Sequence, residues 1–132
     1  MRIECLARRA ELQELPDQAV RAVRALRRWV AARGTGRCTM DSLRAQLGCL
    51  RAAVHLQLLL EEVGAAWPEP FSVSPPCCPR LSHDETTLAG MLSLAAAADR
   101  PGFDRLLSDL LAEDVRERLY HSARVLSGVL PA

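Results

Sequence analysis

The sequence predicts an all-α protein, a single-domain bundle of about five helices with a proline-rich crossover at residues 65–81. Three observations favour this class. Hydrophobic residues make up 49% of the chain but aromatic residues only 4%, so the core must come from Leu, Ala and Val, and Leu and Ala favour helices over strands. Apolar residues also recur at helical spacing along most of the chain. A chain of 132 residues can enclose one core, so one domain is expected over 1–132.

The first clear helix begins at Pro16, after a segment 1–15 that fits either a short helix or a loosely packed arm. Pro16 suits a first helical turn and Gly34 suits the end. One face is apolar, comprising Ala22, Val23, Leu26, Trp29 and Val30. The opposite side carries a basic stripe of Arg21, Arg24 and Arg28, with Arg27 at its flank.

The second helix is predicted to run from Thr39 or Asp41 to about Val63 and to stop at Gly64. Its apolar residues are Leu43, Ala45, Leu47, Cys49, Leu50, Ala53, Val54, Leu56, Leu60 and Val63. They cover most of the circumference, a pattern that is typical of a helix buried among others. We therefore expect one continuous central helix.

Five prolines interrupt the pattern between residues 65 and 81, because proline lacks an amide donor and biases the preceding residue toward extended backbone. The same segment carries Trp67 and Phe71, so we expect an ordered crossover laid over the core.

Three helices are predicted after the crossover. Ser82 and Glu85 form a capping box for the first of them, which runs to about Ala98. The second shows the spacing of Phe103, Leu106, Leu107, Leu110 and Leu111. The third covers roughly residues 113–129.

Charge is unevenly divided. Eleven arginines against seven acidic residues give residues 1–64 a net charge of +4, and six against nine give residues 65–132 a charge of −3. The basic stripe could bind nucleic acid, but it has no interleaved aromatic residues. The opposed halves favour another copy of the chain, a homodimer, or another protein as partner.

No catalytic constellation is recognisable. The three histidines, His55, His83 and His121, lie in no catalytic signature, and the adjacent carboxylates Asp84 and Glu85 point in different directions on a helix. We therefore expect no enzyme activity, no cofactor and no small-molecule substrate.

The adjacent thiols of Cys77 and Cys78 are the one candidate for chemistry. With His83 they could bind a soft metal ion, and Arg80 could favour a reactive thiolate at Cys78. Zinc-binding cysteines normally stand two to four residues apart, however, and no second pair completes the set. A structural role for the pair, between flanking prolines, is the stronger interpretation.

The segment SVSPPCCPRLSHDETTL, followed by DRPGFDRLLSDLL, resembles the central part of an uncharacterised family of small all-helical bacterial proteins. The family pattern is Cys-Cys-x-Arg-[Leu/Met]-[Ser/Thr]-x-[Asp/Glu]-Glu. In this sequence its positions are Cys77, Cys78, Arg80, Leu81, Ser82, Asp84 and Glu85. The likeness is most specific over residues 71–111. It implies a GC-rich bacterial source and no particular activity.

The leading functional hypothesis is a non-enzymatic, self-associating helical interaction module. Its candidate surface comprises Arg21, Arg24, Arg27, Arg28, Trp67 and Phe71. The alternatives are a metal- or redox-responsive protein using Cys77 and Cys78, and weak nucleic-acid binding through the stripe. Five cysteines without paired spacing and the lack of an apolar leader or spanning segment predict a soluble cytoplasmic protein with reduced thiols.

Overall fold

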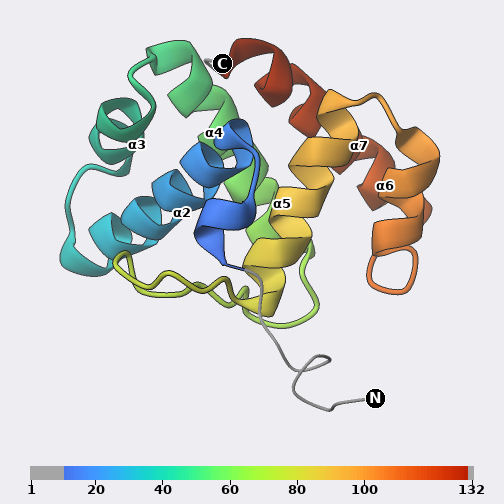
Figure 1. The fold of residues 1–132 in the computed structure, drawn as a ribbon, viewed down its shortest axis with the longest axis horizontal. Coiled ribbons are helices and arrows are strands. Elements are labelled where there is room, and N and C mark those ends of the chain that lie inside the picture. Colours follow the sequence, from blue (N-terminus) through green and yellow to red (C-terminus); the bar gives the residue numbers. More distant parts are fainter. Residues whose placement is uncertain (1–10, 131–132) are drawn as a thin grey trace.

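The computed structural model describes residues 11–130, and this part of the chain is all-helical (Figure 1). This confirms the all-α class. A 3₁₀ helix, η1, is followed by six α-helices. Their bounds are η1 Leu12–Glu14, α2 Asp17–Thr35, α3 Thr39–Leu47, α4 Leu50–Ala66, α5 His83–Ala96, α6 Arg100–Leu107 and α7 Glu113–Val129. Most of the predicted N-terminal arm, residues 1–10, lies outside the described residues.

The predicted central helix is wrong, because the chain forms two helices there, α3 and α4. Gly48 ends α3 in the left-handed conformation, with φ +70°, and its amide donates to the carbonyl of Arg44. Cys49 then adopts an extended conformation and serves as the N-cap of α4. A glycine accepts positive φ without steric cost, so the Gly48–Cys49 step can turn the chain between two leucine-rich helices.

The first helix also ends later than predicted. Gly34 continues α2, and the helix stops at Gly36, which takes the left-handed conformation with φ +74°. The capping box at the start of α5 is confirmed: the Ser82 hydroxyl accepts from the Glu85 amide, and the Glu85 carboxylate accepts from the Ser82 amide.

The helices pack around one main apolar core. α4 lies between α3 and α7, and α5 packs against α2, α6 and α7. In Figure 1, α4 passes behind α2 and α5. The core side chains come from every α-helix; the largest fully buried ones are Phe103, Leu43, Leu56, Leu59, Leu88, Met91, Leu107, Leu119 and Leu126. A smaller cluster of Leu12, Val23 and Leu81 joins η1 to α2 and to the residues before α5.

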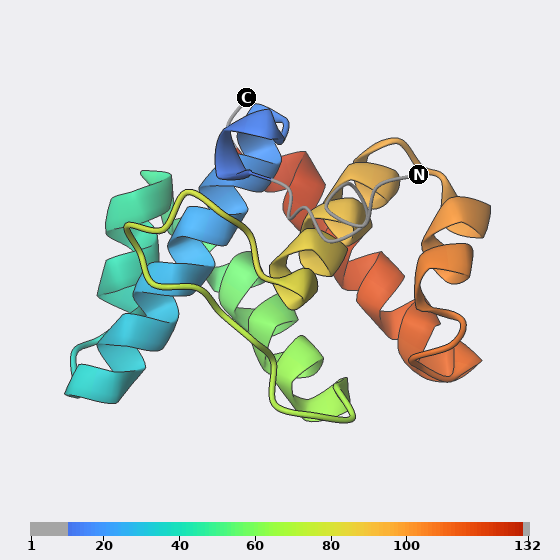
Figure 2. The same cartoon turned by 60° about the horizontal axis from the view of Figure 1, so that its bottom comes forward.

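Residues 67–82, which connect α4 to α5, form neither helix nor strand apart from an isolated bridge between Glu11 and Arg80. The connection runs out across α2 and returns to the first turn of α5 (Figure 2). Its one internal backbone hydrogen bond joins the Cys78 amide to the Pro75 carbonyl at 3.0 Å. Most of its other hydrogen bonds join it to α2, η1 and α5.

Candidate functional site

Arg27 occupies the centre of the contact between α2 and the 67–82 connection. It stands one turn after Val23, on the side of α2 that the connection covers, and only 1% of the residue is exposed. A guanidinium carries five N–H donors and is costly to bury without partners. The partners of Arg27 must therefore lie within the protein.

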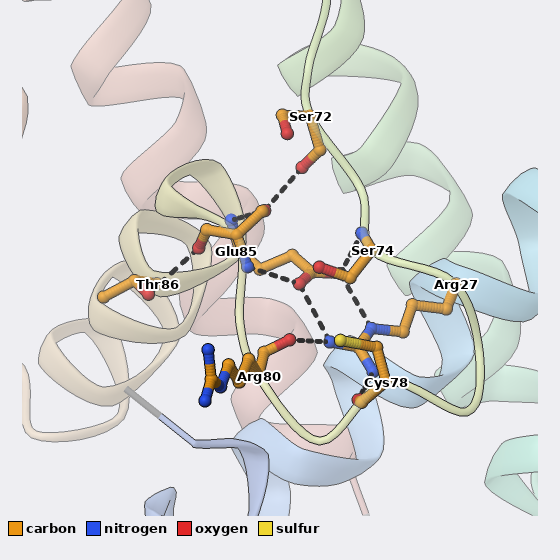
Figure 3. Close-up of polar contacts among 8 residues, drawn as sticks. Arg27, Ser72, Ser74, Cys78, Arg80, Glu85 and Thr86 are labelled. Carbon is orange, nitrogen blue, oxygen red and sulfur yellow. Dashed lines mark hydrogen bonds and ion pairs between the residues drawn. The ribbon is translucent and has the colours of Figure 1, made fainter. Parts of the chain in front are cut away.

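The Arg27 guanidinium donates four hydrogen bonds (Figure 3). Nε and Nη2 donate to the two oxygens of the Glu85 carboxylate at 2.8 and 3.0 Å. Nη1 donates to the Cys78 carbonyl at 2.6 Å, and Nη2 also donates to the Arg80 carbonyl at 2.8 Å. One side chain of α2 thus holds both α5 and the backbone of the connection.

Glu85 completes the arrangement from the first turn of α5. Besides Arg27, its carboxylate accepts from the backbone amides of Ser82 at 2.8 Å and Ser74 at 3.2 Å. The side chain is fully buried, and a buried carboxylate is tolerated only when it is paired and hydrogen-bonded. Glu85 therefore acts as the junction of α2, the connection and α5.

The pairing stabilises the charged form of both Arg27 and Glu85. The hydrogen bond from Arg27 to Glu85 raises the pKa of Arg27 further, against the opposing effect of burial. Burial pushes the pKa of Glu85 up, but the hydrogen bonds from Arg27 and from the Ser82 and Ser74 amides outweigh it, so the pKa lies below its ordinary value. Both groups are therefore charged at neutral pH.

Asp84, the neighbour of Glu85, holds the beginning of the connection. Its carboxylate accepts from the indole of Trp67 at 3.2 Å and from the Ser72 amide at 2.7 Å. The Ser82 hydroxyl donates to the Ser72 carbonyl at 2.7 Å. The two adjacent acids thus accept from different residues of the connection, Asp84 from Trp67 and Ser72 and Glu85 from Ser74.

These contacts correct part of the predicted interaction surface. Arg27 and Trp67 are buried, because Arg27 pairs with Glu85 and the Trp67 ring packs in the core beside Phe71, with ring centroids 5.2 Å apart. Phe71 is half-buried. Of the stripe, Arg24 and Arg28 are exposed and Arg21 is partly exposed.

The two thiols lie at the far end of the connection. Residues 75–78 form a turn with Pro76 and Cys77 at its centre, closed by the amide of Cys78. Cys77 is exposed and Cys78 is half-buried. Their turn borders a hollow of about 420 Å³, whose other walls are formed by η1, α2 and α3. The lining residues are Leu12, Gln13, Arg24, Arg28, Gln46, Pro76, Cys77, Cys78 and Pro79.

This hollow brings together two features that the sequence left apart, the arginine stripe and the cysteine pair. Arg24 and Arg28 stand one turn apart on α2 and face the turn that carries Cys77. His83 is exposed at the start of α5. Within residues 11–130, no group of three or more His, Cys, Asp and Glu side chains is placed to hold a metal ion.

The sequence patterns also missed an exposed apolar ridge on α4. Leu50, Val54 and Leu58 follow one another at intervals of four residues, so they share one face of the helix. They are 51, 39 and 52% exposed, whereas the opposite face of α4 is buried in the core. The sequence does show that apolar residues surround most of this helix. Periodicity alone, however, does not tell whether each apolar face is buried or exposed.

The chain is thus a small helical protein whose 67–82 connection is hydrogen-bonded to Arg27 and Glu85. Its surface carries an apolar ridge on α4 and a hollow lined by two arginines and two cysteines. Comparisons of the chain with protein-family models, with curated proteins and with solved structures find no match. Among residues 11–130, no helix combines the length and the apolar character needed to cross a bilayer.

Proposed function

We propose that the protein is a non-enzymatic helical interaction module that associates with a second copy of itself through α4. The single observation that supports this most strongly is the ridge of Leu50, Val54 and Leu58, three large apolar side chains in one line that remain 51, 39 and 52% exposed. The proposal keeps the bacterial origin and the cytoplasmic location expected from the sequence.

Contact of these apolar side chains with water is unfavourable in free energy, and association would remove that contact. Single apolar residues on a surface are ordinary, but a contiguous line of them marks an interaction site. Complete burial of a Leu or Val side chain is worth about 1.5–3 kcal/mol. Two ridges packed together bury six such side chains that are already partly covered, which is enough to offset part of the entropy lost on association.

Charges on the same helix favour a second copy as the partner. Arg51 flanks the ridge near the start of α4, and Glu61 lies on the ridge line near the end. Both are exposed, and neither forms an ion pair within the described part of the chain. A two-fold interface makes each contact twice. In an antiparallel pairing about an axis level with Leu56, position 51 faces position 61 and position 54 faces position 58.

The test is the mass of the particle in solution, measured by sedimentation over a range of protein concentrations. The wild-type protein should be a dimer, and Leu58→Arg should be a monomer because it puts two like charges into the apolar contact. Leu106→Arg is the matched control, since Leu106 is another exposed leucine, 40% exposed, on α6; it should remain a dimer.

Charge reversal tests the antiparallel arrangement itself. Arg51→Glu and Glu61→Arg should each weaken the dimer, because each creates two like-charge contacts. The combined Arg51→Glu/Glu61→Arg protein should recover the wild-type dissociation constant. A monomeric wild-type protein at every concentration, or a double variant no tighter than the single ones, would contradict the proposal.

A second candidate function, a thiol-responsive protein, is favoured by the hollow that joins Cys77 to Arg24 and Arg28. It uses a different part of the molecule from α4 and is developed below.

A further inference from the structure

The hollow beside Cys77 brings an exposed cysteine together with two arginines. Cys77 and Cys78 line the hollow from the connection, and Arg24 and Arg28 line it from α2. None of its lining residues is acidic. Neither arginine forms an ion pair with another described residue.

The wall that carries the thiols is anchored on both sides. The Arg27 guanidinium holds the Cys78 carbonyl at 2.6 Å, and the Leu12 amide of η1 donates to the Pro79 carbonyl at 2.7 Å. Pro76 fixes the backbone immediately before Cys77. The position of the backbone at Cys77 is therefore set by two elements, α2 and η1, and by Pro76, and Cys77 remains exposed.

The two side chains with a formal charge that line the hollow are both arginines. Arg27 lies behind it, but its charge is compensated by the Glu85 carboxylate that it grips at 2.8 Å. Arg24 and Arg28 receive no such compensation from the described residues. Guanidinium groups bind carboxylates through paired hydrogen bonds, so the hollow suits a small ligand that carries carboxylates.

We propose that this hollow binds the disulfide form of a small, carboxylate-bearing thiol, and that Cys77 forms a mixed disulfide with it. The Cys77 thiolate attacks one sulfur of the disulfide R–S–S–R. The Cys77–S–R bond forms, the S–S bond of the ligand breaks, and R–S⁻ leaves with the electron pair. The cysteine sulfur is oxidised and the departing sulfur is reduced, so no further oxidant is required.

The structure assigns the reaction to Cys77 rather than to Cys78. Cys77 stands exposed at the tip of the turn, whereas Cys78 is half-buried and its carbonyl is held by Arg27. Exchange requires the attacking sulfur to approach in line with the S–S bond, so access to the thiol decides between the two. Arg24 and Arg28 act as binding residues that raise the local concentration of the anionic disulfide.

The experiment compares two small disulfides of similar size, dithiodiglycolate with two carboxylates and 2-hydroxyethyl disulfide with none. Reduced protein is mixed with each, and the rate at each cysteine is followed by peptide mass spectrometry. The rate at Cys77 is divided by that at Cys38, which is also exposed, to cancel the intrinsic reactivity of each reagent. This ratio should be on the order of tenfold higher for the dicarboxylate.

Substitutions test the role of the two arginines. In Arg24→Gln/Arg28→Gln the preference for the dicarboxylate at Cys77 should disappear. The control Arg44→Gln/Arg105→Gln removes the same charge at two exposed positions outside the hollow and should keep the preference. Circular dichroism verifies that each variant is folded.

A test on the wild-type protein needs no variant. Salt at about 1 M shortens the screening length to about 3 Å, so the preference should largely vanish. Equal ratios for the two disulfides, or a preference that survives either high salt or the loss of Arg24 and Arg28, would overturn the inference. Self-association through α4 is measured independently, so failure of one proposal leaves the other intact.

Discussion

Arg27 shows how one side chain can decide the shape of a segment far away in the sequence. Four of its five N–H donors are used, two on Glu85 and two on carbonyls of the connection. Lysine has three donors and no planar fork, so it could not reproduce this set. Arginine is thus required here for its shape as well as for its charge.

Replacement of Arg27 by methionine should strongly destabilise the protein. Arg27→Met leaves the Glu85 carboxylate buried without its counter-charge, and such losses cost about 3–5 kcal/mol. Urea unfolding followed by circular dichroism measures the change. The adjacent Arg28→Met, at an exposed position, should change stability by no more than about 0.5 kcal/mol.

The double variant Arg27→Met/Glu85→Leu separates the ion pair from the backbone contacts. A buried pair replaced by apolar side chains is often harmless. Here the carbonyls of Cys78 and Arg80 and the amides of Ser74 and Ser82 would also lose partners. We therefore expect the double variant to remain less stable than the wild type. A free energy of unfolding equal to that of the wild type would show that the backbone contacts contribute little.

At the residue scale, the sequence predicted local roles better than distant ones. The capping role of Ser82 and Glu85 is visible because its partners are three residues apart. The pairing of Arg27 with Glu85 spans 58 residues. A helical wheel places Arg27 at the edge of the basic stripe, and nothing local distinguishes it from the solvated Arg28.

At the scale of the helices, the break between α3 and α4 is best tested by substitution of Gly48. Gly48→Ala should destabilise the protein by about 1–2 kcal/mol, because an L-residue is strained at φ +70°. Within the described residues, no neighbouring atom lies within 4 Å of the position that the new methyl group would occupy, so the cost comes from the backbone alone.

Thermal unfolding of Gly48→Ala measures this cost, and Gly64 provides the matched control in the same measurement. It lies inside α4 and also has open space for an added methyl group. Gly64→Ala should therefore stabilise the protein by about 0.5–1 kcal/mol through the helix propensity of alanine. The same chemical change is expected to have opposite signs at the two sites, and equal signs would contradict this account of the break.

At the element scale, periodicity identified helical sequence correctly but could not locate the break. Leucine recurs with helical spacing on both sides of Gly48, so the two helices look continuous in the sequence. A single glycine inside a helical pattern either is tolerated or ends the helix, and tertiary packing decides between these outcomes. The exposed face of α4 has the same cause, since periodicity shows that a face is apolar but not what covers it.

Loss of the ion pair in acid should weaken the whole molecule, because Arg27 and Glu85 join α2, the connection and α5. The folded pKa of Glu85 lies below its ordinary value, so the stability that this group contributes is complete above about pH 4.3. It is lost as the pH falls through the lower folded pKa. The free energy of unfolding, measured in urea at a series of pH values, should fall steadily below about pH 4.3.

The variant Glu85→Gln identifies the source of this pH dependence. It should be less stable at neutral pH and should show a shallower decline in acid. Part of the decline should remain, because the pKa of Asp104 is also lowered: its hydrogen bonds from Arg116 and Arg100 outweigh the effect of desolvation. A decline as steep as in the wild type would contradict the assignment to Glu85.

At the scale of the whole molecule, the class of fold was predictable and the surfaces were not. Composition and periodicity report the helices, which depend on near neighbours. The hollow between α2 and the cysteine turn, and the ridge on α4, depend on how distant elements pack. The arginine stripe and the cysteine pair were each visible in the sequence, but their convergence on one hollow required the fold.

The span between Arg27 and Glu85 also bears on how the chain matures as it is synthesised. A ribosome that has just completed α2 must add α3, α4 and the whole proline-rich stretch before the carboxylate that receives the guanidinium exists. The contact of α2 with α5 is therefore among the last to form, although α2 can already pack against α3. During that interval the leucine-rich residues of α3 and α4 are incompletely buried in the nascent polypeptide. This is the stage at which a chaperone that binds exposed apolar segments would bind best.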